Sequence, residues 1–428
     1  MKAKTIENGF KETEIGLIPE SWMTMKAQDV TKITSGGTPR RDEKKYFNGN
    51  IYWVKSGELE DNILYGTEEK ITGEALQNSS AKLFPVGTVL IAMYGATVGK
   101  TGLLGVEATT NQAVCAILPN EKIFVPEFLR HYFILIRDKL LNQRYGGAQP
   151  NISQAIIKNT LIPLPKIEEQ QKIASVLSKI QQAIEQQNKI IQTTKELKKS
   201  LMNKLFTEGL HGEEQKKTEI GLIPKGWDIV KISEGYEFTT KPRGFNIKEN
   251  AKIPFIPMEL ISEESRIADK YELKDKVGSG TFVLKGDLIV AKITPSFENG
   301  KQGIIDNIPF EFAYATTEVW PIHNVKGKSD INYLYYYLKK AAVRTDVAGK
   351  MEGSTGRQRV PKNVLENLLM PLPSLKEQEG IASIFISLDK KISQAEARKQ
   401  TLQSLFKTML NQLMTGRVRV KNLDIEVN

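Results

Sequence analysis

The sequence predicts a tandem duplication in which a mixed α/β (α+β) head followed by a long helix occurs twice. The segment Thr13–Pro19 recurs letter for letter as Thr218–Pro224, 205 residues later. Each copy has a tryptophan three residues after its proline, Trp22 and Trp227. Each half also ends in a long apolar stripe at helical spacing, which predicts that the two helices pair.

A second repeated segment supports the period of the duplication. Pro163-Leu-Pro165 followed by Glu169-Gln170 recurs 208 residues later as Pro371-Leu-Pro373 followed by Glu377-Gln378. Between these segments the halves diverge but stay alignable, so the same fold is expected to carry different side chains. We expect a first head over residues 1–162 and a central long helix over 163–212. A second head is expected over 213–370, and a C-terminal helix with its tail over 371–428.

The heads are predicted to mix strands and helices. Short apolar runs bounded by Gly and Pro indicate strands, while longer runs without either indicate helices. The strands are expected over residues 51–54, 88–93, 113–118, 288–293 and 318–322, and the helices over 128–141 and 331–342.

The long helices are predicted to begin after Pro165 and Pro373, because proline commonly precedes a helix but disrupts its interior. Apolar residues then recur at alternating steps of three and four, as in a coiled coil. Each stripe alone could pack on the core of its own head. Two matching stripes favour an antiparallel two-helix coiled coil about a pseudo-two-fold axis, with a head at either end. The predicted seam residues are Ile173, Leu177, Ile180, Ile184, Ile191, Leu201, Leu205, Ile381, Phe385, Leu388, Ile392, Leu402, Phe406, Met409 and Leu413.

Composition excludes several classes of protein. The 428 residues hold one cysteine, Cys115, which rules out an intramolecular disulfide framework and a zinc site with several thiolates. Cys115 lies in an apolar run and is expected in the core. No apolar run is long enough to span a bilayer, and no secretory leader is evident, so we expect a cytoplasmic protein. The formal net charge of +10 hints at an acidic partner, although it is spread along the chain.

A glycine turn in the first head resembles a phosphate-binding loop but departs from its pattern. Gly95 and Gly99-Lys100-Thr101 follow an apolar strand, yet three residues separate the glycines where the motif has four. The residues that follow are poor helix formers, and the second head has Lys301 followed by Gln302 at the matching place. We expect the turn to present Lys100, and Lys301 in the second copy, to a phosphate backbone.

Basic and polar residues also gather near glycine or proline in both heads. Arg, Gln and Asn can make bidentate contacts with base edges in the major groove of DNA, and neighbouring glycines allow close approach. Each cluster alone could be an ordinary solvated loop, but clusters recur in both heads just ahead of the long helices. The candidate residues are Thr38, Arg40, Arg41, Lys44, Lys45, Arg144, Gln149 and Asn151 in the first head, and Lys241, Arg243, Lys248, Lys350, Arg357, Gln358 and Arg359 in the second.

The repeated segments resemble the specificity subunit of type I restriction–modification enzymes. The resemblance covers about residues 13–416. It rests on Pro-Leu-Pro…Glu-Gln…Ile-Ala before a long helix, present twice, and on Gly-Leu-Ile-Pro-x-x-Trp before each head. It implies that each head is a target recognition domain for one half of a split, asymmetric site in double-stranded DNA. It also implies that the helices fix the half-site separation.

The resemblance further implies a chain with no catalytic activity and no bound cofactor. Two methyltransferase subunits would supply adenine methylation with S-adenosylmethionine, and restriction subunits would join through the complex with ATP and magnesium. No Asn-Pro-Pro-aromatic or Pro-Asp segment is present, which agrees with that role. Two alternatives remain open at this point, namely a nucleotide-binding enzyme or switch built on Gly99-Lys100-Thr101, and a coiled-coil adaptor that does not bind DNA.

Overall fold

The computed structural model describes residues 9–142, 151–245, 252–354 and 356–420. The chain divides into two compact units. The first unit comprises residues 1–188 and 397–428, and the second comprises residues 189–396. Each unit therefore holds one head and a segment of each long helix. None of the helices formed by the described residues combines the length and the apolarity that a membrane span requires.

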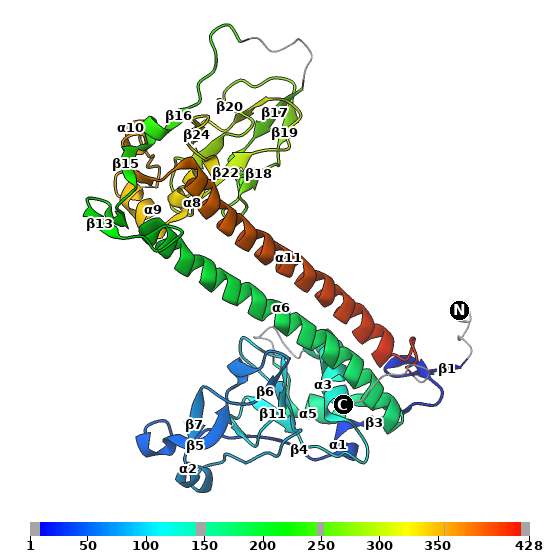
Figure 1. Ribbon diagram of the computed structural model, residues 1–428. Helices are drawn as coiled ribbons and strands as arrows, with labels where there is room; N and C mark the ends of the chain where they lie inside the picture. The colour runs from blue at the N-terminus through cyan, green and yellow to red at the C-terminus, as the bar shows by residue number, and fades with distance from the viewer. Residues whose placement is uncertain (1–8, 143–150, 246–251, 355, 421–428) are drawn as a thin grey trace. The chain divides into compact units, whose positions relative to one another are not determined.

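The head of the first unit is built from a five-stranded sheet, a three-stranded sheet, the two-stranded pairs β1–β2 and β3–β12, and short helices (Figure 1). Its strands are β1 (Phe10–Thr13), β2 (Gly16–Pro19), β3 (Met23–Lys26), β4 (Ile33–Ser35), β5 (Phe47–Val54), β6 (Asn62–Leu64), β7 (Glu69–Ile71), β8 (Val89–Ala92), β9 (Thr101–Leu104), β10 (Thr109–Thr110), β11 (Val114–Ile117) and β12 (Leu161–Leu164). Its helices are α1 (Ala27–Val30), α2 (Gly73–Gln77), α3 (Pro126–Leu135), α4 (Arg137–Asn142) and α5 (Gln154–Asn159), with 3-10 turns η1 (Lys44–Tyr46) and η2 (Ser56–Glu58).

The five-stranded sheet of the first unit, in the order β4-β11-β8-β9-β6, is buried on both faces. Alternate residues of β8 enter two different cores, as the period of a strand requires. Val89 and Ile91 join the core that contains α3 and the long helices, whereas Leu90 and Ala92 face the β5 side of the head. Cys115 is buried in the former core, as the sequence predicts. Strands buried on both faces read as continuous apolar runs, which made them recognisable.

The head of the second unit repeats this arrangement. Its strands are β13 (Gln215–Thr218), β14 (Gly221–Pro224), β15 (Asp228–Lys231), β16 (Tyr236–Phe238), β17 (Ile253–Ile256), β18 (Ile267–Ala268), β19 (Glu272–Lys274), β20 (Thr281–Leu284), β21 (Leu288–Ala291), β22 (Gln302–Ile305), β23 (Phe312–Ala315), β24 (Val319–Asn324) and β25 (Leu369–Leu372). Its helices are α7 (Ile232–Gly235), α8 (Ile331–Lys339), α9 (Ala341–Ala348) and α10 (Lys362–Glu366), with the 3-10 turn η3 (Met258–Leu260).

The two five-stranded sheets match strand for strand. The order β16-β24-β21-β22-β18 corresponds to β4-β11-β8-β9-β6, and in both sheets only the last described pair is parallel. The tandem duplication is therefore confirmed at the level of topology. The other main sheet of each head differs. It has three strands (β10-β5-β7) in the first head and four (β19-β17-β23-β20) in the second.

Two predicted helices are interrupted. The helix expected over 128–141 is α3 and α4, separated at Ile136, and the helix expected over 331–342 is α8 and the start of α9, separated at Lys340. Lys340 has extended backbone angles, φ −62° and ψ 128°. Apolar periodicity continues across both breaks because residues on either side face the same core, so the pattern could not reveal them.

The long helices are α6 (Ile167–Glu208) and α11 (Leu375–Met414). Every predicted seam residue is buried or half-buried. In the first unit Ile173 and Leu177 share a core with Leu410 and Leu413.

In the second unit Phe206 stacks on Phe385, and Lys198 pairs with Asp389 at 2.5 Å. Residue numbers fall along α6 as they rise along α11, so the two helices run antiparallel within each unit, as predicted. The ends of each apolar stripe also pack in the cores of the heads. At those ends, the alternative prediction that a stripe packs on a head core is therefore correct.

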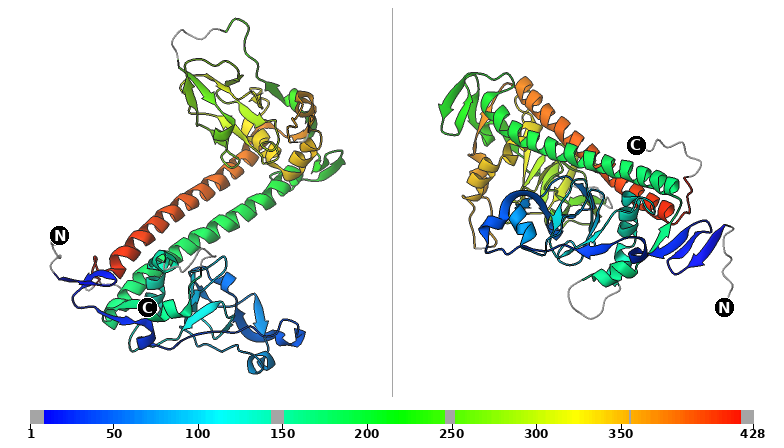
Figure 2. Two further views of the ribbon diagram at one scale, coloured as in Figure 1. Left: turned by 180° about the vertical axis from the view of Figure 1, so that it is seen from behind. Right: turned by 90° about the horizontal axis from the view of Figure 1, so that it is seen from below.

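The repeated sequence segments meet at the start of each long helix. The indole nitrogen of Trp22 donates to Glu169 at 3.1 Å, and that of Trp227 donates to Glu377 at the same distance. The repeated hairpins, β1–β2 and β13–β14, come just before these tryptophans, and β13–β14 lies at the C-terminal end of α6 (Figure 2). The exact repeats are thus explained by one junction built twice.

The glutamine after each of these glutamates is fully buried. The Gln170 side chain accepts from the Val125 amide at 2.8 Å and donates to the carbonyl groups of Ile123 and Pro165 at 3.1 and 2.9 Å. Gln378 makes the same three bonds in the second unit, with Asp330, Lys328 and Pro373. One amide therefore joins the helix start to the loop before α3 or α8.

We expect Gln170→Leu to lower the free energy of unfolding by about 2–4 kcal/mol, because it leaves buried backbone groups without partners. Urea unfolding of the whole chain measures this. The control is Gln171→Leu at the exposed neighbouring position. Equal losses from both variants would contradict the account.

Candidate DNA interface

In each head a glycine turn lies beside the segment that leads into the next short helix. In the first unit the turn after β8 is joined to this segment by the Ile152 amide, which donates to Met93 at 2.7 Å. In the second, the Val360 amide donates to Lys292 at 2.7 Å after β21. The structure thus joins each glycine turn to a segment that follows it by 59 residues in the first head (Met93 to Ile152) and by 68 in the second (Lys292 to Val360).

The loop cluster of the second head holds cationic side chains that already have partners within the head. Arg359 makes a bidentate ion pair with Glu318, at 2.9 and 2.8 Å. Lys292 lies 4.0 Å from the centre of the Trp320 ring, and burial lowers the pKa of its ammonium group. Gln358 stands beside them, since its carbonyl accepts from Thr294. The sequence predicts a strand over residues 288–293, which includes Lys292, whereas the observed strand β21 ends at Ala291 and leaves Lys292 in the turn.

The cluster of the first head holds Arg41 in a fixed place. Its guanidinium lies 4.9 Å from the ring centre of Phe47 and 4.7 Å from that of Trp53, and it pairs with Glu69 at 2.6 Å. Lys55 pairs with the same carboxylate. An arginine that packs over two rings and is paired with a carboxylate has lost rotamer freedom, which lowers the cost of presenting its remaining donors.

Most other candidates also have partners within their own head. Arg40 pairs with Asp42, Lys45 with Glu74, Lys350 with Asp346, and the Thr38 hydroxyl donates to Gln112. Lys241 lies 5.9 Å from the Tyr314 ring centre, and Asn151 pairs with Tyr94 as a β-bridge. Arg144, Gln149 and Lys248 lie outside the described residues.

Three candidates remain available for a ligand. Lys44, Arg243 and Arg357 are exposed, and their side chains make no hydrogen bond or ion pair with the described residues. Lys44 begins the turn η1 between β4 and β5, and Arg243 lies between β16 and β17, whereas Arg357 belongs to the turn ahead of α10. These positions are the first expected to meet a polyanion.

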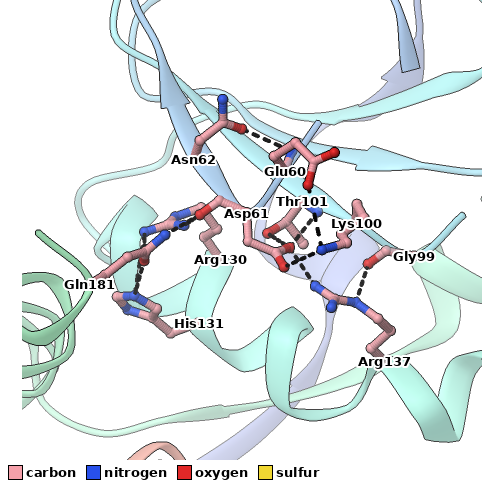
Figure 3. Close-up of polar contacts among 10 residues, drawn as sticks. All are labelled: Glu60, Asp61, Asn62, Gly99, Lys100, Thr101, Arg130, His131, Arg137 and Gln181. Carbon is pink, nitrogen blue, oxygen red and sulfur yellow. Dashed lines mark hydrogen bonds and ion pairs between the residues drawn. The ribbon is translucent and has the colours of Figure 1, made fainter. Parts of the chain in front are cut away.

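The two lysines of the glycine turns have partners within their own heads, and Figure 3 shows those of Lys100. Lys100 Nζ lies 3.5 Å from Asp61 Oδ2 and 3.7 Å from Glu60 Oε2. Lys301 Nζ donates to the Met258 carbonyl at 3.1 Å. Burial by itself would raise the pKa of Asp61, but Arg137, the Thr101 amide and Lys100 together hold it below its usual value. No motif in the sequence marks Asp61 as a partner of these groups.

The same turn is not built as a phosphate cradle. Such a cradle needs free backbone amides followed by a helix. Here the Gly99 amide donates to Ala92 and the Lys100 amide to Thr97, while Thr101 begins strand β9. Among residues 9–142, 151–245, 252–354 and 356–420, no three side chains of His, Cys, Asp or Glu gather as a metal site requires.

These features define a class of protein with two recognition heads of one fold, each carrying its own set of basic and polar loops. The model of the type I restriction modification DNA specificity domain matches residues 19–196 and 224–404. The chain therefore belongs to the family of type I restriction–modification specificity subunits, with two tandem recognition domains.

Specificity subunits from other organisms match this chain, either over nearly its whole length or over about half of it. The type I restriction enzyme MjaVIII specificity subunit of Methanocaldococcus jannaschii is 28% identical over 427 residues, which is 98% of either chain. The EcoAI specificity subunit of Escherichia coli is 32% identical over 212 residues, covering 47% of this chain and 34% of that one. The crystal structure of a type I S subunit from M. genitalium is similar in fold, with a TM-score of 0.60, 14% identity, and 96% and 98% of the two chains covered.

We expect Lys44→Ala to reduce the salt dependence of DNA binding by about one released counterion, because an exposed unpaired lysine can neutralise a phosphate. Lys100→Ala should leave the salt dependence unchanged, because Asp61 and Glu60 already compensate the charge of Lys100. Dissociation constants measured over a series of salt concentrations test both variants. The reverse result would show that Lys100 contacts a phosphate, as the sequence alone predicts.

Proposed function

We propose that this chain reads a bipartite, asymmetric sequence in double-stranded DNA, with one half-site for each head. One observation carries the proposal. The junctions at the long helices are the same in both units, down to the bonds of Gln170 and Gln378, while the loop clusters differ. A duplicated protein that keeps its scaffold and changes its loops is suited to two unrelated targets on one ligand.

The chemistry of the clusters supports DNA as that ligand. The first head offers Arg41, stacked and paired, with exposed Lys44 beside it. The second offers the Arg357–Arg359 turn next to Lys292. Arginine and glutamine can select bases by bidentate bonds, whereas exposed lysines contribute affinity through phosphates without selecting sequence.

The chain itself carries out no catalysis in this proposal and acts in the cytoplasm. It assembles two methyltransferase subunits, which supply the adenine-methylating site and bind S-adenosylmethionine. Restriction subunits join through that complex and use ATP and magnesium. The chain binds none of these cofactors. The glycine turn at Lys100 supports this assignment, because its amides are already used within the head.

Replacing residues 218–370 with the head of another family member should change one half of the recognised sequence and leave the other intact. Each head has its own apolar core, so the exchange leaves the first core undisturbed. Mapping methylated adenines in DNA exposed to the chimera and its methyltransferase measures the result. A simultaneous change of both halves would refute independent reading.

The long helices are proposed to set the distance between half-sites. Inserting four residues after Thr194 adds about 6 Å of rise and about 40° of rotation beyond one turn, so the seam persists as a stutter. The methylated sites should gain one or two base pairs between unchanged half-sites, at about 3.4 Å per step. A single inserted residue should instead destabilise the protein, because it turns the later seam residues by about 100°. An unchanged spacing with normal methylation after the four-residue insertion would contradict the proposal.

A further inference from the structure

In the first unit a polar connection joins the long helix α6 to the outer part of the head (Figure 3). Gln181 Nε2 donates to the carbonyl oxygen of Asp61, and Gln181 Oε1 accepts from Arg130 at 3.0 Å. Arg130 also donates to the Asp61 carbonyl, at 2.5 Å. Gln181 of α6, Arg130 of α3 and the backbone of Asp61, in the loop before β6, therefore meet at one point.

Asp61 carries this connection into the head. It has a positive φ of 61°, which turns its carbonyl toward the helices while its carboxylate points the other way. The carboxylate accepts from the Thr101 amide at 2.9 Å and pairs with Arg137. A displacement of Gln181 relative to the head would thus disturb bonds to β9 and α4.

The second unit has a connection at the matching helix turn, made of different residues. Asp389 follows Gln181 by 208 residues, the same offset that relates Gln170 to Gln378. Its carboxylate accepts from the hydroxyl of buried Tyr336 at 2.7 Å and from Lys198 at 2.5 Å. Lys339 of the same helix, α8, donates to the Glu263 carbonyl at 2.6 Å, and so joins α8 to the loop that corresponds to the Asp61 loop.

These contacts differ in kind from the apolar packing around them. Apolar packing is non-directional and tolerates small rotations, whereas a buried hydrogen bond weakens steeply with misalignment. Arg130 is 2% exposed, and its Nε has no partner among the described residues. Loss of the Gln181 oxygen would leave the Arg130 nitrogen that it accepts from with only the contact to His131 Nε2, at 3.3 Å. The arrangement therefore favours one orientation of the head on its helix.

We propose that Gln181 and Asp389 are positioning residues that fix the orientation of each head on its long helix and so limit the half-site separations that the chain accepts. This inference rests on the proposed function. A head that rotates slightly would reach its half-site in DNA that is one base pair too short or too long, a shift of about 3.4 Å along each strand. Its contacts to bases would be unchanged.

The test uses the whole chain in complex with its methyltransferase subunits. DNA duplexes carry both half-sites with the natural separation, one base pair fewer, or one more. The readout is the initial methylation rate on each altered duplex divided by that on the natural one. Gln181→Leu should raise this ratio about fivefold or more, since buried neighbours are coupled on that scale, with half-site preference unchanged. The control is Gln182→Leu, at an exposed position one residue along.

Asp389→Ala provides a second, independent variant in case Gln181→Leu does not fold, with Lys390→Ala at an exposed position as its control. It should raise the ratio in the same way. An unchanged ratio in the folded variants, or an equal fall in rate on all three duplexes, would overturn the inference and leave residues 181 and 389 as contributors to stability alone. If the unaltered chain directs methylation to no bipartite site, the proposed function fails instead.

Discussion

The buried amide at the start of each long helix is the constraint on which the remaining structure depends. Gln170 and Gln378 satisfy backbone groups that the proline-containing approach and the preceding loop leave without partners. Because a buried unsatisfied group is costly, only one register of helix against head is favourable. The glutamate before each glutamine adds a bond to the repeated tryptophan. Head, hairpin and helix are thereby fixed at one place in both units.

A scaffold fixed in this way allows the heads to diverge. The five-stranded sheets keep the same strand order because both faces are buried, and any strand substitution meets a packed core. The turns and clusters at the sheet ends carry no such restriction. Arg41 packs over two aromatic rings in the first head, whereas Arg359 pairs with Glu318 beside Trp320 in the second. The two heads therefore differ in the side chains that these clusters offer, as well as in the number of strands of their second sheet.

Electrostatics in these heads depends on pairing more than on net charge. The chain has a formal charge of +10, yet several candidate cations have a carboxylate within hydrogen-bonding distance, among them Arg40, Lys45 and Lys350. Such surface pairs contribute little to stability, and they hold side chains in place. Specific recognition then rests on a few oriented groups and a few free ones, such as Lys44 and Arg357. The polar connections at Gln181 and Asp389 extend the same principle to whole heads.

The sequence by itself determined the duplication, the family, the paired helices and the strands with two buried faces. These follow from exact repeats and from apolar periodicity, which are local in the chain. Only the tertiary structure decided which basic residues are free. Arg41 and Glu69 lie 28 residues apart, and Lys100 and Asp61 lie 39 apart, with no motif linking either pair. An ion pair forms wherever folding brings opposite charges together, and that depends on loop geometry, which leaves no periodic pattern in the sequence. The sequence therefore predicts Lys100 as a phosphate contact, whereas in the fold Lys100 pairs with Asp61 of its own head.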